Sequence, residues 1–248
     1  LTYIIFSNID TYLFFTCLYI FIIFFFFIIG SYGISKSFYS IFQLGTLVFL
    51  LLTIQFIIFS FAPKTIDIGR VEPNLLNREF NCNSPNQKWV TDITYLKYDN
   101  GRKRLYLSAI EDLYNREIIA YKISDNLDMS FVENTLGEAF KKVSTSEFRN
   151  LIIHSDQGVH YKSNIYKSML KKYGVKQSMS RKGNCYDNSC IENFFGHLKT
   201  ELIYQNSYSC KENLIKSVDE YIYWYNNYRV QSKLNNMTPV EYRCHMTS

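Results

Sequence analysis

The sequence predicts an α/β fold with a mixed five-stranded sheet and flanking helices, preceded by an apolar helical N-terminal segment. Three observations lead to this class. Residues 89–124 contain three strand-like segments separated by turn signals. Residues 130–203 alternate between amphipathic, helix-like stretches and two short strand-like runs. Residues 1–62, in contrast, hold only two charged side chains, Asp10 and Lys36.

The apolar segment holds 14 of the 20 phenylalanines and admits three interpretations. Residues 11–35 and 37–63 are uncharged, and each exceeds the roughly 20 residues that cross a bilayer, so they are transmembrane-like. Out-of-frame translation of A/T-rich DNA gives the same composition and is the second interpretation. A soluble helix pair is the third, although four consecutive phenylalanines leave no polar face. The predicted domains are residues 1–62 for this segment, 63–86 for a linker or arm, 87–205 for the α/β core and 206–248 for a C-terminal helical extension.

Three strands are expected directly after the polar arm. Residues 89–98 alternate as a strand does, and Asn100 with Gly101 is a hairpin signal. Residues 104–114 and 117–124 are the next two strands, with Asn115 and Arg116 at the turn. The three together predict an antiparallel meander.

Helices and short strands are expected after the meander. Ser130 is the predicted N-cap of a helix over residues 130–143, because Glu133 follows three residues later as in a capping box. Residues 151–156 form a nearly continuous apolar run that is typical of a buried parallel strand. Gly174 is the expected end of the next helix. The remaining elements are helices at 163–174, 189–203 and 211–229 and a strand at 176–180. This order is that of the ribonuclease-H-like architecture.

Three acidic residues, Asp92, Asp156 and Glu192, stand where a carboxylate is an odd choice for structure alone. Asp92 interrupts a β-branched run, Asp156 ends the apolar strand, and Glu192 lies near the start of a helix. Carboxylates that converge from separate elements repel one another unless a hard cation such as Mg²⁺ lies between them. A pair of carboxylate-held ions is suited to in-line attack on a phosphodiester. We therefore predict nucleic-acid phosphoryl transfer, with these three residues as metal ligands.

Charge and cysteine content give only weak information about the partner and the cellular compartment of the protein. The net charge of +5 belongs to residues 63–248, since Asp10 and Lys36 cancel, and it permits a polyanionic partner without demanding one. The six cysteines form no CxxC pair, which favours a reduced, cytoplasmic protein over a disulfide framework.

Four long segments resemble the catalytic subunit of bacterial insertion-sequence transposases, the second-reading-frame product with a retroviral-integrase-like core. They are PNQKWVTDITYL, IIHSDQGVHY, SRKGNCYDNSCIENFFGHLKTE and YIYWYNNYRVQSKLNNMTPVEYR. The resemblance runs from about Glu72 to Arg243 and excludes residues 1–62. It implies an integrase catalytic core over residues 87–205 and a DDE recombinase that uses two Mg²⁺ or Mn²⁺ ions. It also implies cleavage and strand transfer of DNA at insertion-sequence ends, near the nucleoid. The implied partners are those ends, target DNA, further copies of the chain and the first-reading-frame product, with a membrane only if residues 1–62 are genuine.

Four residues near Glu192 are predicted to contact DNA. Lys199 follows Glu192 by two helical turns and therefore shares its face, and the family carries a basic residue there. Arg181, Lys182 and Asn184 lie in the glycine-containing loop before the helix.

Other polar and aromatic residues are given structural interpretations. Asp187 is taken as a turn or cap former, and Glu111 and Asp112 as exposed strand or turn acids. His154 is expected to support the site by packing or hydrogen bonding, and Trp224 to belong to the core. Two alternative functions remain at this point, a ribonuclease-H-like nuclease and an inactive or membrane-tethered relic of a transposase.

Overall fold

The computed structural model describes residues 70–246 of the 248-residue chain. The expected apolar helices and the boundary at residue 63 lie outside the described residues. No helix of the described part combines the length and the apolar character that crossing a bilayer requires.

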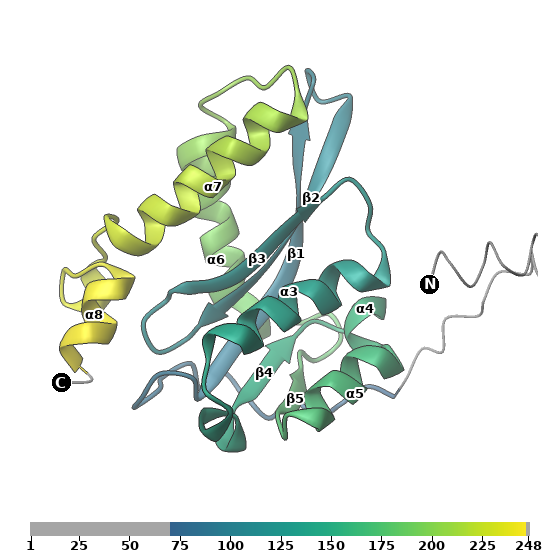
Figure 1. Ribbon diagram of the computed structural model, residues 1–248, viewed down its shortest axis with the longest axis vertical. Coiled ribbons are helices and arrows are strands. Elements are labelled where there is room, and N and C mark those ends of the chain that lie inside the picture. The colour runs from purple at the N-terminus through teal and green to yellow at the C-terminus, as the bar shows by residue number, and fades with distance from the viewer. Residues whose placement is uncertain (1–69, 247–248) are drawn as a thin grey trace, which may run out of the picture. The chain divides into compact units, whose positions relative to one another are not determined.

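A five-stranded mixed sheet lies at the centre of the described part, with strand order β3-β2-β1-β4-β5 (Figure 1). The first three strands form an antiparallel meander, while β4 is parallel to β1 and β5 is parallel to β4. The strands are β1 (Lys88–Tyr98), β2 (Lys103–Asp112), β3 (Ile118–Ser124), β4 (Ile152–Ser155) and β5 (Lys176–Met179). The predicted order and type of every strand are confirmed.

Local sequence explains the turns of this sheet. Asp99, Asn100 and Gly101 have φ of 52°, 52° and 80°, the left-handed conformation that a tight hairpin requires and that Asn and Gly tolerate. Gly174 has φ of 69° and ends the helix before β5, as predicted.

The helices cover both faces of the sheet. They are α3 (Met129–Lys142), α4 (Val159–Lys162), α5 (Asn164–Lys172), α6 (Ser189–Leu198), α7 (Lys211–Asn227) and α8 (Pro239–Met246). Residues of α6 and α7 pack with Val90 and Leu96 of β1 in one buried cluster. Residues of α3 and α5 pack with Trp89 in a second cluster. The side chains of the successive residues Trp89 and Val90 therefore point to opposite faces of the sheet. Figure 1 shows α3 and α5 on one side of the sheet, with α6 and α7 on the other.

Several local expectations were wrong. The N-cap of α3 is Asp128, whose carboxylate accepts the Phe131 N–H at 2.9 Å, whereas Ser130 lies inside the helix and donates to Asp128. Asp competes with Ser for this position because its carboxylate is an equally good acceptor. The helix expected at 189–203 is α-helical only to Leu198 and continues as a π-helical turn, Lys199–Ile203.

Glu111 and Asp112 are buried at 1% and 0% exposure rather than exposed. Asp112 shapes the chain around it, because its carboxylate accepts the N–H of Asn86 at 2.8 Å and of Tyr114 at 3.0 Å. Glu111 lies 3.3 Å from the guanidinium of Arg116. Buried acids need such partners, and these partners are invisible in the local sequence pattern.

The aromatic residues of α7 divide between the core and the surface. Tyr221 and Tyr225 are buried, at 7% and 4% exposure. Trp224 is 42% exposed, so its assignment to the core was wrong. It lies one position before Tyr225 on the helix and therefore faces away from the buried side.

Candidate active site

Asp92 and Asp156 lie level with each other where β1 and β4 separate. The parallel register pairs Val90 with His154, and this is the last pair between the two strands. Asp92 and Asp156 are each two residues further along. Asp156 directly follows Ser155, the last residue of β4, at the carboxyl end of a parallel strand where α/β sheets place their ligands.

Glu192 reaches the same place from the first turn of α6. The preceding residue, Ile191, is fully buried in the cluster that also contains Val90. Alternation along β1 puts Asp92 on the same face as Val90, toward α6. The packing of Ile191 fixes this turn of α6 over β1, where the charge of Glu192 acts on the pKa of Asp92.

The electrostatics of the three carboxylates show that they interact. Burial raises the pKa of Asp92 to about 7, with Asp156 and Glu192 adding like-charge repulsion, while the Ile93 N–H and Lys199 act in the opposite direction. The pKa of Glu192 is also raised, first by burial and then by the charge of Asp156. Each negative charge thus makes the next one harder to hold, which favours a positive charge between them.

Backbone N–H groups orient the carboxylates of Asp92 and Asp156 by binding one oxygen of each, and the second oxygen of each remains available to a ligand. One oxygen of Asp92 accepts its neighbour's N–H, from Ile93, at 2.7 Å. One oxygen of Asp156 accepts the N–H of Gly158 at 2.8 Å. A Cβ at position 158 would lie 2.8 Å from this oxygen, so only glycine lets the amide approach. No hydrogen bond from a described residue acts on the Glu192 carboxylate.

The donor set suits a hard divalent cation. Asp92, Asp156 and Glu192 offer carboxylate oxygens to which no lysine or arginine of the described part is hydrogen-bonded, and Mg²⁺ and Mn²⁺ prefer such ligands. Within residues 70–246, no three His, Cys, Asp or Glu side chains are gathered closely enough to hold a metal ion as they stand. The three carboxylates are therefore neighbours that repel each other rather than a closed cage.

An open cleft of about 530 Å³ adjoins Asp156 and Glu192. Its other wall is the loop between β5 and α6, including the predicted DNA-contact residues Arg181, Lys182 and Asn184. The loop turns at Gly183, whose φ of 73° suits glycine. The cleft thus joins two of the carboxylates to the three loop residues.

Lys199, the fourth predicted DNA-contact residue, also lies near the site. Its ammonium is 5.3 Å from the ring centre of Tyr95 and counteracts the raised pKa of Asp92. The change to π-helical geometry begins at Lys199 itself, so the residue keeps its predicted position relative to Glu192.

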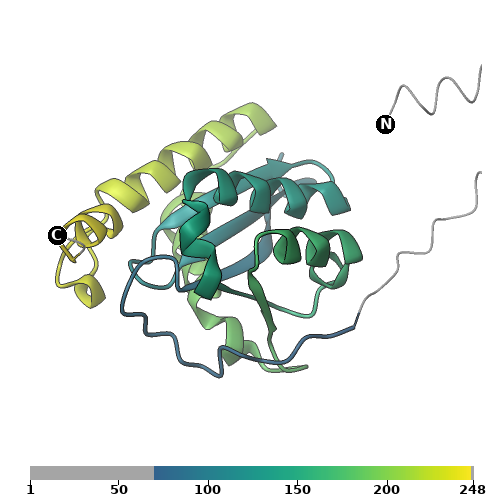
Figure 2. The ribbon, with the colours of Figure 1, turned by 60° about the horizontal axis from the view of Figure 1, so that its bottom comes forward.

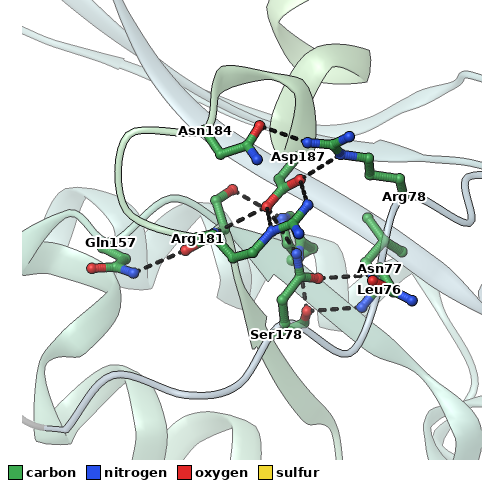
Figure 3. A network of polar contacts seen from close by, with 11 residues as sticks. Leu76, Asn77, Arg78, Gln157, Ser178, Arg181, Asn184 and Asp187 are labelled. Carbon is green, nitrogen blue, oxygen red and sulfur yellow. Dashed lines mark hydrogen bonds and ion pairs between the residues drawn. The ribbon is translucent and has the colours of Figure 1, made fainter.

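Asp187 anchors the loop wall of the cleft (Figure 3). Its buried carboxylate accepts the backbone N–H of Arg181 at 3.0 Å and both ends of that guanidinium at 2.9 and 2.8 Å. Arg78 and Asn74, which lie in the arm before β1, donate to the same carboxylate at 2.9 Å each. Asp187 is therefore a turn former, as expected, and also the centre of an ion-pair network that was not expected.

The arm, here residues 70–87, runs along β5 and the loop wall (Figure 2). The N–H groups of Leu75 and Leu76 donate to the Ser178 hydroxyl on β5 at 2.8 and 3.1 Å. Because these donors occupy its lone pairs, the hydroxyl proton goes to His154 Nδ1, 2.7 Å away. The imidazole is therefore neutral with its proton on Nε2, and burial lowers the pKa of His154 to about 4.

The sequence interpretation missed Asn74, Arg78 and Ser178. The contacts of Asn74 and Arg78 with Asp187 span 113 and 109 residues of chain. An asparagine and an arginine in a polar segment carry no local signal of such a role. Nothing in the local sequence indicates that Ser178, a serine within a strand, accepts hydrogen bonds from the arm.

Comparisons with known proteins identify family models, relatives and solved structures that the chain resembles. Two models described as "Integrase core domain" match residues 83–185 and residues 192–246. The chain is 48% identical over 177 residues to a putative transposase, InsK, for insertion sequence element IS150 of Escherichia coli (strain K12), covering 71% of this chain and 61% of the relative. It is 44% identical over 177 residues to an uncharacterized transposase-like protein of Haemophilus influenzae, covering 71% of this chain and 80% of that protein. The chain thus spans less than two thirds of the length of the E. coli relative.

Solved structures share the fold at low sequence identity. A chain of the simian T-cell lymphotropic virus intasome in complex with PP2A regulatory subunit B56 gamma matches with a TM-score of 0.54 at 18% identity, over 73% of this chain and 60% of that chain. The catalytic core domain of BIV integrase matches with a TM-score of 0.50 at 16% identity, over 65% of this chain and 96% of that chain. At these identities the likeness supports the ribonuclease-H-like fold alone.

Proposed function

The chain belongs to the insertion-sequence transposases that carry an integrase core domain, and we propose that it cleaves and joins DNA strands at the ends of an insertion sequence. The observation that carries this proposal is that Asp92 and Asp156 both lie two residues beyond the last register pair of β1 and β4, with Glu192 near enough for its charge to act on the pKa of Asp92. The substrates are the insertion-sequence ends and target DNA. Further copies of the chain and the first-reading-frame product are the proposed protein partners.

The three carboxylates are the residues that would hold two Mg²⁺ or Mn²⁺ ions in this proposal. Such ions, when bound, activate the attacking water or 3′-hydroxyl and stabilise the leaving 3′-oxygen. The chain's own contribution is to hold the carboxylates at fixed places, Asp92 on a central strand and Glu192 on a packed helix. Burial and the two nearby acids raise the pKa of Asp92 to about 7, which favours its protonated form, and a bound cation would shift the balance back to the carboxylate.

The surrounding residues position DNA in this scheme. The ammonium of Lys199 lies near Asp92 and is proposed to neutralise a phosphate beside the reacting bond. The loop of Arg181, Lys182 and Asn184 forms the cleft wall along which a strand would lie. Phosphoryl transfer depends mainly on such positioning and on charge neutralisation.

Replacement of each carboxylate tests the proposal. Asp92→Asn, Asp156→Asn and Glu192→Gln should each abolish Mg²⁺-dependent cleavage of insertion-sequence ends, because each removes a charged ligand while keeping its shape. Asp99→Asn, at the β1–β2 hairpin, is the matched control and should cleave normally. Cleavage near the parent level by any of the three site variants, with a normal circular-dichroism spectrum, would contradict the assignment.

A further inference from the structure

Two arginines from distant parts of the chain share one buried carboxylate at the cleft wall. Asp187 has no exposed side-chain surface, whereas the side chains of Arg78 and Arg181 remain 45% and 53% exposed. The Arg78 Nε and the Arg181 Nη2 approach the same oxygen of Asp187, at 2.9 and 2.8 Å. Two positive charges therefore meet one negative charge, and the excess positive charge faces solvent.

The arm adopts a costly conformation to bring Arg78 to this place. Asn77 and Arg78 have φ of 48° and 63°, in the left-handed region. For a residue with a side chain such as Arg78 this conformation costs about 1–2 kcal/mol. The Asn74 side chain accepts the Asn77 N–H at 2.8 Å and stabilises the turn. The backbone is thus arranged so that the guanidinium reaches Asp187.

Further contacts fix the orientation of the Arg78 guanidinium. A second nitrogen of Arg78 donates to the side-chain oxygen of Asn184 at 3.0 Å, and the guanidinium lies 5.6 Å from the ring centre of Tyr186. Arg181 presents the Nε–Nη2 edge of its guanidinium to Asp187, which leaves the Nη1 side for another acceptor. Arg181 holds the pKa of Asp187 far below its usual range, so this carboxylate stays ionised. Both guanidiniums are therefore preorganised, and each keeps N–H groups that have no acceptor in the described part of the chain.

We propose that Arg78 and Arg181 form a two-arginine site for one DNA phosphate, with Asp187 as the positioning residue. The inference rests on the proposed function and adds the arm to its DNA-binding surface. Planar guanidiniums recognise phosphate oxygens through paired N–H donors, and a rigid pair loses little side-chain entropy on binding. Because Arg181 lines the cleft with Asp156 and Glu192, the phosphate belongs to the strand that enters the cleft.

Binding of a short insertion-sequence-end duplex to the full chain, measured by fluorescence anisotropy in EDTA over a range of salt, tests the site. Arg78→Ala and Arg181→Ala should each weaken binding about tenfold, the loss expected for one charge-assisted contact. Each should lower the salt slope by about one. The double variant should lower the slope no further than either single variant, because one phosphate is involved. Additive losses, or no loss in Arg78→Ala, would overturn the proposal.

The variant Asp187→Asn distinguishes a role of Asp187 in positioning the two arginines from a purely electrostatic effect of its charge on DNA binding. It adds one unit of positive charge next to the DNA, so a purely electrostatic account expects tighter binding. The positioning account expects weaker binding, because both guanidiniums lose their anchor. Asp99→Asn is the matched control, since Asp99 pairs with Arg102 at 3.1 Å on the exposed hairpin, and its binding should be unchanged or slightly tighter. Tighter binding by folded Asp187→Asn would refute the site.

A second variant decides the matter if Asp187→Asn does not fold. Arg78→Lys keeps the charge and lies on the surface, but its ammonium lacks the planar fork that holds the arginine side chain at a fixed angle between Asp187 and Asn184. It should bind about as weakly as Arg78→Ala, and binding equal to the parent would overturn the proposal. The binding assay needs no cleavage. A parent chain that binds DNA but does not cut it with Mg²⁺ would contradict the proposed function alone, whereas parental binding by the arginine variants would contradict the site alone.

Discussion

Replacement of Ser178 by alanine should release the arm from β5 and destabilise the core. The single hydroxyl of Ser178 accepts the N–H groups of Leu75 and Leu76 and donates to His154 Nδ1. Alanine fills nearly the same volume, so packing changes little. The effect of Ser178→Ala therefore reports the three hydrogen bonds.

The expected loss follows from the burial of each partner. Leu75 is 45% exposed, so water can replace the hydroxyl at its N–H. Leu76 and His154 are buried at 1% and 0% exposure, and each is left with an unsatisfied polar group. An unsatisfied buried group costs about 1–3 kcal/mol, which gives a total of about 3 kcal/mol. For a domain of this size, such a loss lowers Tm by roughly 6–12 °C.

Denaturant unfolding and amide hydrogen exchange measure this effect. The Leu76 amide should exchange about a hundredfold faster in Ser178→Ala, as expected from a loss of about 3 kcal/mol. Ser168→Ala is the matched control, because Ser168 donates only to a backbone carbonyl on the exposed side of α5, and its stability should stay within about 0.5 kcal/mol of the parent. A loss below about 1 kcal/mol in Ser178→Ala, with Leu76 still protected, would refute the assignment of Ser178 as the receptor for the arm.

Two further predictions concern Lys199 and Glu111. Lys199→Ala should weaken the binding of all DNA sequences alike and lower the salt dependence of the binding constant by about one unit of slope. An unchanged slope would show that Lys199 does not contact a phosphate. Burial raises the pKa of Glu111 to about 7 against the opposing effect of Arg116, so the folded state holds a proton between about pH 4.5 and 7 that the unfolded state has lost. Stability from this group is therefore fully present below about pH 4.5 and lost as pH rises through 7. The Tm of the parent relative to Glu111→Gln should fall between pH 5 and 8, and a pH-independent difference would contradict the raised pKa.

The sheet and the helices could be predicted because their signals are local. Alternation in residues 89–98, the turn signal of Asn100 and Gly101, and the stop at Gly174 each depend on a few neighbouring residues. The N-cap of α3 was misplaced by two residues because Asp128 and Ser130 are both competent caps. The placement of Asp92, Asp156 and Glu192 followed from topology, since a parallel strand beside β1 must bring its carboxyl end close to the middle of β1.

The network around Asp187 could not be predicted, because its members come together only through the fold. Arg78 and Asp187 are separated by 109 residues and lie in segments without regular periodicity. The burial of Glu111 was missed as well, because Arg116, five residues later, reaches it only once the turn between β2 and β3 has formed. Polar side chains in irregular segments carry little information about their partners until those segments are placed.

The acidic residues of this chain also show why a raised pKa does not identify a ligand by itself. Burial is the largest cause of the raised pKa for Asp92, Glu111 and Asp112 alike. Glu111 has an arginine partner and Asp112 has two amide donors, which lower these pKa values in part, while a neighbouring acid adds repulsion to each. For Asp92 and Glu192 the nearby acids add repulsion, and no arginine or lysine hydrogen-bonds to either carboxylate in the described part. Neither burial nor like-charge repulsion is therefore specific to the site, and what marks it is that three acids lie near one another without a hydrogen-bonded lysine or arginine in the described part. Asp187 is the converse case, since two arginines stabilise its charge and leave it to organise the cleft wall rather than bind a metal.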